Sequence, residues 1–254
     1  GLSADNGFPC GVAVRASETV ALGFYKRGLV TGLAADYVGA LSLAPIEIPR
    51  SIPGIEPGAF LYEAEDASRA VPVRAPASHK GSFGHVVVFA GGPASEGASA
   101  LAAWAALRAG AGLVTVATGS GDRSSLRSRL RPEIQMAEAA EVVKRVGTGW
   151  IGVVGPGLGT DPSARALLEL ALNTAWPLVL DADALNLAGE NQGTYSKRLA
   201  ERAKRCPQVL TPHPKEAARL LDVTTEVVQL DRYESARKIA ARYGGICLLK
   251  GKGT

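Results

Sequence analysis

The chain has 254 residues, of which 46% are hydrophobic and 20% charged, a composition typical of a globular protein with one large domain or two small ones. The net charge of +4 is small, aromatic residues make up only 6%, and basic and aromatic residues do not alternate, which argues against a nucleic-acid-binding function. Cys10, Cys206 and Cys247 lie far apart without C-x-x-C spacing, so the sequence indicates a reducing compartment, the cytoplasm, rather than a disulfide framework or a zinc site.

The first third of the chain predicts little regular structure. Extended segments are predicted at 18–23 and 38–43, and they resemble the closing strands of a domain. Residues 49–78 are rich in proline and alanine and show no sustained period, which predicts a linker or crossover. No apolar run reaches the about 18 residues that a membrane span needs, so no membrane association is expected.

From residue 85 onward, short apolar runs alternate with helical patterns. The runs predict strands at 86–90, 113–117, 150–154, 178–180, 209–210 and 246–249. The helical patterns lie at 98–109, 163–174 and 194–204, from 214 onward, and at 230–243. Strands that are apolar on both faces and alternate with helices predict an α/β fold, with a mostly parallel sheet covered on both sides. Arg127 and Arg131, four residues apart, are predicted to share one solvated helix face.

Two glycine-rich turns follow predicted strands, at the edge of the sheet where ligands bind in such folds. Gly91 and Gly92, with Gly97, open a helix and would let backbone amides approach an anion. Residues 155–159, Gly-Pro-Gly-Leu-Gly, form a rigid turn whose backbone can lie close to a ligand. Tight-turn geometry explains either turn about as well as ligand binding does.

Polar residues follow two further strands. Asp181 and Asp183, with Asn186 nearby, are predicted to project to the same side and to bind a cation or a hydroxyl. The alternative is helix capping by Asp183 with a core hydrogen bond from Asp181. His213 lies between two prolines that restrict its backbone, which favours substrate contact over a place in the core. His85 begins a strand and is expected to pack.

Taken in order, these stretches resemble the ADP-dependent NAD(P)H-hydrate dehydratase family over residues 79–254. The resemblance lies in His79–His85 through Gly91-Gly92, Leu107–Val114, Gly155–Gly159, Asp181–Asn186, Leu210–Glu216 and Lys250–Thr254. It implies a ribokinase-like three-layer fold and a cytoplasmic hydro-lyase that removes water from hydrated NADH or NADPH while ADP or ATP is hydrolysed. It also implies Mg²⁺ with the nucleotide, and a homo-oligomer.

The N-terminal piece is similar to the end of an NAD(P)H-hydrate epimerase domain, which bacteria often fuse in front of the dehydratase. The similarity lies in Gly1–Gly7, Thr19–Gly23, Lys26–Leu29 and Asp36–Gly39. It implies that residues 1–50 are the remnant of a Rossmann-like epimerase domain, that 51–78 link the domains, and that 79–254 begin the dehydratase. The K⁺ site of the epimerase would lie upstream of Gly1.

The resemblance also assigns roles to individual residues. The nucleotide phosphates would lie along Lys250, Gly251, Lys252, Gly253 and Thr254, and the hydrated cofactor would contact Ala98, Gly157 and His213. The family's G-T-G-D segment, which carries the catalytic aspartate, is expected downstream of Thr254. We therefore expect a piece of a bifunctional repair enzyme, truncated at both ends and inactive by itself.

Two alternatives share these features. A ribokinase-like kinase of a small vitamin precursor would have the same fold, so the fold cannot separate it from the dehydratase. The epimerase-like N-terminus favours the repair enzyme. A nucleotide-binding module without activity is the second alternative, and a G-T-G-D segment in the reading frame after Thr254 would argue against it.

Overall fold

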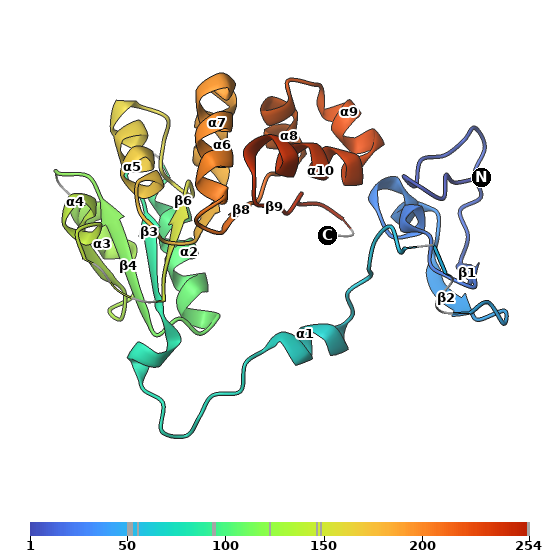
Figure 1. Ribbon diagram of the computed structural model, residues 1–254, viewed down its shortest axis with the longest axis horizontal. Helices are drawn as coiled ribbons and strands as arrows, with labels where there is room; N and C mark the ends of the chain where they lie inside the picture. Colours follow the sequence, from blue (N-terminus) through green and yellow to red (C-terminus); the bar gives the residue numbers. More distant parts are fainter. Residues whose placement is uncertain are drawn as a thin grey trace. The chain divides into compact units, whose positions relative to one another are not determined.

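The computed structural model describes residues 1–49, 53–54, 56–92, 95–121, 123–145, 147 and 149–252. The chain divides into two compact units (Figure 1). One comprises Gly1–Ser78 together with the residues after Lys250, and the other comprises His79–Lys250. Each unit is described by itself.

The first unit is built on two parallel strands. Strand β1 (Glu18–Leu22) pairs with β2 (Ala40–Ala44) from Glu18 opposite Ala40 to Leu22 opposite Ala44. Two short 3₁₀ helices, η1 (Arg27–Leu29) and η2 (Gly32–Asp36), connect them. Both extended segments predicted from the sequence are confirmed.

Helix α1 (Ala64–Ala70) lies in the segment that the sequence predicts as a linker or crossover. None of its residues is buried. The backbone N–H of Glu63 donates to Asp66 Oδ2 at 3.0 Å, and Arg69 lies 3.7 Å from Glu65 and 3.6 Å from Asp66. Such charge pairs one turn apart stabilise a helix that has no apolar stripe. The sequence of α1 therefore shows no apolar period from which a helix could be predicted.

The second unit is built around a seven-stranded sheet of order β5-β4-β3-β6-β7-β8-β9, in which every neighbouring pair is parallel. The strands are β3 (His85–Phe89), β4 (Leu113–Thr118), β5 (Gln135–Glu138), β6 (Trp150–Val154), β7 (Leu178–Leu180), β8 (Gln208–Leu210) and β9 (Ile246–Cys247). The six predicted strands are confirmed, although β9 is shorter than expected. Strand β5 was missed because it is an edge strand with polar residues at both ends and no apolar run.

Helices connect the strands of this sheet. They are η3 (Lys80–Phe83), α2 (Glu96–Arg108), α3 (Ser124–Arg129), α4 (Ala139–Val142), α5 (Pro162–Leu172), α6 (Ala182–Glu190), α7 (Gln192–Ala203), α8 (Pro214–Leu221), α9 (Thr225–Leu230) and α10 (Arg232–Tyr243). The predicted helices are confirmed within a few residues, whereas α4, α6 and α9 of this unit were not predicted. None of the described helices is both long and apolar enough to cross a bilayer.

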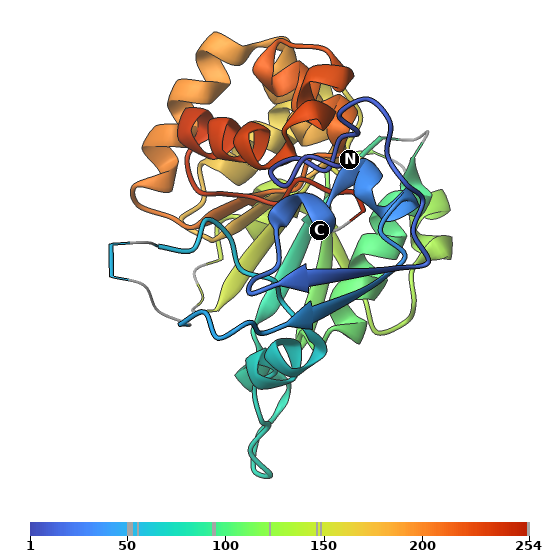
Figure 2. The ribbon, with the colours of Figure 1, turned by 90° about the vertical axis from the view of Figure 1, so that its right-hand side faces the viewer.

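The sheet has a helix layer on each face, which is the predicted three-layer α/β arrangement. Val87 and Phe89 of β3 join a hydrophobic cluster with residues of α4 to α10, whereas Val88 and the following Ala90 join a second cluster with α2 and α3. This alternation follows from the two-residue period of a strand. Helix α10 packs against both α7 and α8 (orange to red in Figure 1 and Figure 2).

The arginine-rich segment differs from the prediction that Arg127 and Arg131 share a helix face. Helix α3 ends at Arg129, because Arg131 precedes Pro132 and a residue before proline disfavours the helical conformation. Arg127 Nη1 donates to the carbonyl of Ile134 at 2.9 Å. The Arg131 guanidinium instead lies 4.5 Å from the centre of the Trp104 ring.

Candidate functional site

The chain order of the sheet reverses between β3 and β6, and ligands of open α/β sheets bind at the carboxyl edge beside such a point. Both predicted glycine turns lie there, and they bind each other. The amides of Gly91 and Gly92 donate to the carbonyl of Gly157 at 3.3 and 2.9 Å. Gly157 is buried with φ of 67°, and a Cβ there would lie 2.3 Å from Ser99 Oγ. The turn is therefore packed against the start of α2.

A cavity of about 490 Å³ adjoins this turn, with Gly91, Gly92 and Ser99 in its wall. Three polar residues that the sequence analysis missed also line it, namely Thr118, Arg123 and Glu138. Arg123 Nη2 lies 2.7 Å from Glu138 Oε1. The Thr118 hydroxyl and Arg123 Nε are buried without a hydrogen-bond partner among the described residues. The Thr118-Gly119-Ser120-Gly121 turn at the end of β4 was the signal that could have identified this cavity.

The predicted substrate contacts Ala98, Gly157 and His213 do not line this cavity. Ala98 lies in the first turn of α2 and is exposed. The structure thus brings Gly157 close to the first turn of α2, while His213 lies at the end of β8, three strands away in the sheet from β3.

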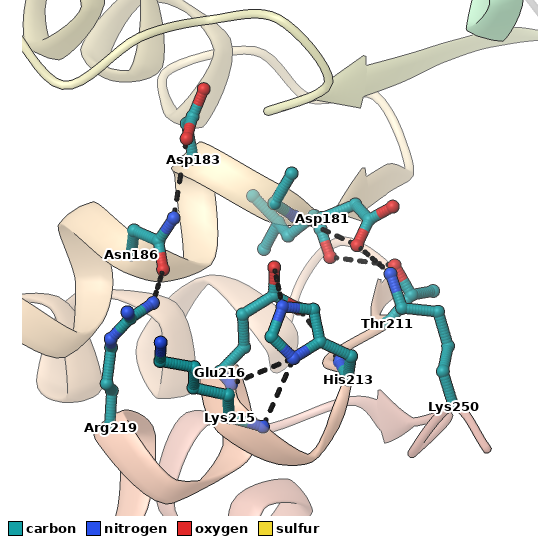
Figure 3. Close-up of polar contacts among 11 residues, drawn as sticks. Asp181, Asp183, Asn186, Thr211, His213, Lys215, Glu216, Arg219 and Lys250 are labelled. Carbon is teal, nitrogen blue, oxygen red and sulfur yellow. Dashed lines mark hydrogen bonds and ion pairs between the residues drawn. The ribbon is translucent and has the colours of Figure 1, made fainter. Parts of the chain in front are cut away.

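A second polar cluster lies at the carboxyl ends of β7, β8 and β9 (Figure 3). Asp181 caps α6, where its Oδ1 accepts the Ala182 amide at 2.9 Å, and the same oxygen lies 2.6 Å from Lys250 Nζ. The Lys250 amide donates to the carbonyl of Pro212 at 2.8 Å, which extends the pairing beyond β9. The Asp181 and Lys250 side chains remain partly exposed, so an anion from solvent could reach the ammonium group.

Asp183 has different partners. Its Oδ2 accepts the Gly159 amide at 2.9 Å, and its Oδ1 accepts Asn186 Nδ2 at 3.3 Å. Asn186 Oδ1 in turn accepts Arg219 Nη1 at 2.6 Å. Asp183 therefore ties the start of α6 to the Gly-Pro-Gly-Leu-Gly turn, and Asn186 ties α6 to α8.

The prediction that Asp181 and Asp183 project to the same side is wrong, as is the alternative in which Asp183 is the helix cap. The chain turns from strand to helix at Ala182, which has φ of 45°, so the two-residue alternation of a strand no longer applies. The two side chains point apart in Figure 3. Among the described residues, no three His, Cys, Asp or Glu side chains gather as metal ligands, so these residues alone do not form a Mg²⁺ site.

His213 caps helix α8 instead of packing in the core. Its Nδ1 accepts the amides of Lys215 at 3.1 Å and Glu216 at 3.3 Å, and its Nε2 lies 3.2 Å from Glu216 Oε1. Glu216 Oε2 accepts the His213 amide at 2.8 Å (Figure 3). The His213 side chain is 46% exposed, whereas that of Glu216 is 5% exposed.

The predicted phosphate loop is described only in part. Gly251 and Lys252 are exposed, and Gly253 and Thr254 lie outside the described residues. Lys250 is thus the member of this loop with defined contacts, to Asp181 and to Pro212.

Comparison with known proteins supports the resemblance. The chain is 38% identical over 258 residues to the bifunctional NAD(P)H-hydrate repair enzyme of Coxiella burnetii, covering 100% of this chain and 51% of that protein. Its structure is similar to the ADP/ATP-dependent NAD(P)H-hydrate dehydratase of Bacillus subtilis, co-crystallized with ATP and Mg²⁺, with a TM-score of 0.61 and 29% identity, covering 75% of this chain and 66% of that one. A ribokinase-like superfamily protein of Enterococcus faecalis gives a TM-score of 0.60 at 26% identity, covering 78% and 69%.

The chain spans about half the length of the curated relatives it matches. The predicted ribokinase-like fold is confirmed by the similar solved structures. Residues 86–254 match the NAD(P)H-hydrate dehydratase family. The chain therefore belongs to the NAD(P)H-hydrate dehydratase family.

Proposed function

We propose that the protein containing this chain removes water from hydrated NADH or NADPH at the expense of ADP or ATP. Family membership supports the reaction class, and it favours the dehydratase over a small-molecule kinase. The observation that carries the proposal is the cluster at the ends of β7 to β9, where Asp181 holds the Lys250 ammonium group at a partly exposed position. The carboxyl edge of a parallel sheet is where such folds bind ligands.

Lys250 would bind the phosphates of the nucleotide. An ammonium group forms strong, charge-assisted hydrogen bonds with phosphate oxygens and stabilises the charge that develops during phosphoryl chemistry. The pairing of its amide with Pro212 supports a defined start for the loop, in which Gly251, Lys252, Gly253 and Thr254 would follow with backbone amides. Mg²⁺ would accompany the phosphates, because this ion is usually bound through substrate phosphates together with one or two carboxylates and waters.

The hydrated dinucleotide would contact Ala98, Gly157 and His213. Ala98 and His213 are exposed or half-exposed, while Gly157 would contribute backbone only. The polar residues Asp181, Asp183 and Asn186 would support these contacts indirectly. Asp183 holds the turn that contains Gly157, and Asn186 holds α8, the helix that His213 caps. The catalytic aspartate would come from a segment downstream of Thr254.

The remaining assignments are also proposals. Residues 1–50 would be the end of an epimerase domain, residues 51–78 a linker and residues 79–254 the start of the dehydratase domain. The repair enzyme of Coxiella burnetii matches the whole chain, which supports this order. We also propose a cytoplasmic homo-oligomer, with the K⁺ site in the epimerase part outside this chain.

Replacement of Lys250 tests the nucleotide site. In the protein extended to the length of its relatives, Lys250→Gln should weaken ADP binding, measured by calorimetry, by about 10-fold or more, the loss expected for one charge-assisted contact. Stability should change by no more than ~1 kcal/mol, because the pair with Asp181 is partly exposed. Lys238→Gln removes the same charge from the exposed face of α10 and is the matched control. Unchanged ADP affinity in Lys250→Gln would remove Lys250 from the site.

Turnover tests the substrate. The extended protein is assayed with ADP on hydrated NADH, and with ATP on pyridoxine and hydroxymethylpyrimidine. Water loss from hydrated NADH supports the proposal. Phosphorylation of a vitamin precursor without dehydration would instead identify a kinase.

A further inference from the structure

We propose that Glu216 is a positioning residue that locks one tautomer of His213, so that His213 meets its ligand through the ring face and ring carbons and takes no part in proton transfer. The identity of that ligand rests on the proposed function, in which it is a hydrated nicotinamide dinucleotide. The geometry of the lock is independent of that function.

The first nitrogen of the ring is occupied by the helix. Nδ1 of His213 accepts two backbone amides, those of Lys215 and Glu216, which are among the unpaired donors at the start of any helix. A proton on Nδ1 would point at these two N–H groups. The arrangement therefore requires a lone pair on Nδ1, and a neutral ring then carries its proton on Nε2.

The second nitrogen is occupied by Glu216. With its proton on Nε2, the ring faces this carboxylate, with Nε2 3.2 Å from Glu216 Oε1, while Oε2 of the same carboxylate accepts the His213 amide at 2.8 Å. Glu216 is almost fully buried and lies in the first turn of α8, where a helix favours negative charge. Both oxygens of the carboxylate are thus used to hold one residue.

These contacts leave the His213 side chain open to solvent in part. The side chain is 46% exposed although both nitrogens have partners within the chain. A general acid or base needs a nitrogen within hydrogen-bond reach of the proton that moves. An exposed imidazole face without free nitrogens instead suits stacking against a planar ring. Nicotinamide and adenine both supply such a ring in the proposed substrate.

The lock is tested by ring-nitrogen NMR on the 254-residue chain at pH 8. The chain has only three histidines, so His213→Asn identifies the His213 signals by their loss, and asparagine is a good helix cap that should keep α8 intact. We expect one tautomer, with a protonated Nε2 and a pyridine-like Nδ1.

Glu216→Gln should shift this pattern, because it removes the carboxylate charge beside Nε2–H and one amide oxygen cannot face both the His213 amide and Nε2–H, although the backbone amides at Nδ1 still favour the same tautomer. The matched control is Glu234→Gln, which removes a carboxylate from the same position of α10, behind its cap Asp231, and should leave the His213 spectrum unchanged. A wild-type ring protonated on Nδ1, a mixture of tautomers, or an unchanged spectrum in Glu216→Gln would overturn the lock.

Kinetics of the extended protein test the consequence. His213→Asn should raise KM for hydrated NADH by about 2- to 12-fold, as expected for a lost aromatic contact, with kcat within about 2-fold of wild type. His213→Phe keeps a flat ring without nitrogens and should retain kcat. A fall in kcat of about 100-fold or more in both variants would show that a ring nitrogen transfers protons and would overturn the inference. If the wild-type protein shows no dehydration at all, the proposed function fails while the NMR result still decides the lock.

Discussion

Among single residues, Gly157 shows how a predicted contact can have a structural role. The sequence predicted either tight-turn geometry or close approach of a ligand, and the structure shows a turn with φ of 67° at Gly157 and close packing by protein atoms. A Cβ on Gly157 would lie 2.3 Å from Ser99 Oγ and 2.4 Å from the Ser95 carbonyl. The absence of a side chain is therefore required by the fold, whatever a ligand also requires.

Gly157→Ala should accordingly destabilise the chain. The left-handed conformation costs ~1–2 kcal/mol for alanine, and overpacking adds ~1–3 kcal/mol. We expect a total loss of about 2–5 kcal/mol in chemical denaturation. Gly193→Ala in α7, where no atom lies within 4 Å of the added Cβ, is the control and should be neutral or slightly stabilising. Near wild-type stability of Gly157→Ala would contradict the conclusion that the fold requires glycine at this position.

Among secondary-structure elements, the start of β3 joins three strands through His85. Its Nε2–H donates to Thr115 Oγ1 of β4 at 2.8 Å, and the Thr115 hydroxyl donates to Gln135 Oε1 of β5 at 3.3 Å. The ring also stacks on Trp150 of β6, with ring centres 4.1 Å apart. His85 therefore packs within the protein, as predicted. It lies at the amino ends of the strands, the opposite edge of the sheet from the candidate site.

This network predicts a dependence of stability on pH. Burial, and secondarily the charge of Arg145, lowers the pKa of His85 below its ordinary value of 6.5. The folded state therefore binds fewer protons than the unfolded state, so the contribution of His85 is fully present above about pH 6.5 and is lost as pH falls further. The free energy of unfolding should decrease from pH 7.5 to 5.5, measured in urea.

His85→Phe keeps a ring against Trp150 and removes the titrating group, so it should flatten this decrease even though it lowers stability at pH 7.5. His79→Gln, at an exposed histidine before η3, is the control and should retain the wild-type slope. Equal slopes in wild type and His85→Phe would assign the pH dependence to other groups.

At the scale of the whole molecule, the two ends of the sheet in the second unit differ in how well their apolar residues are buried. The hydrophobic cluster of α2 and α3 involves β3, β4 and their neighbours, with Val153 of β6 at its margin. At the other end, Ile246 of β9 is 64% exposed and Leu248 is 44% exposed. An apolar edge strand of this kind is usually paired or covered.

We therefore predict that the 254-residue chain shows no dehydration of hydrated NADH with ADP, whereas a protein extended by about 100 residues, an ordinary domain's worth, does. The physical reason is that, in the proposed function, the catalytic aspartate and the rest of the phosphate site would lie in the added segment. Both proteins are assayed side by side after gel filtration. Comparable turnover would place the chemistry within residues 1–254 and would make Asp181 and Asp183 the first residues to reconsider.

The sequence by itself determined the strands of the seven-stranded sheet apart from β5, the main helices, and the edge of the sheet that carries the candidate site. Apolar runs such as 86–90 and 150–154 are local signals, because a strand buried on both faces needs them whatever its neighbours are. The order of the glycine, aspartate and histidine motifs was also sufficient to identify the family.

Only the tertiary structure decided what the polar side chains do. Asp181 and Lys250 are 69 residues apart, and no local pattern predicts that they pair. The separation of Asp181 from Asp183 depends on a helix that starts between them, and the occupation of both His213 nitrogens depends on how α8 begins. Polar contacts are directional and are chosen among all groups that the fold brings within about 3 Å, so they follow from the assembled sheet and not from spacing along the chain.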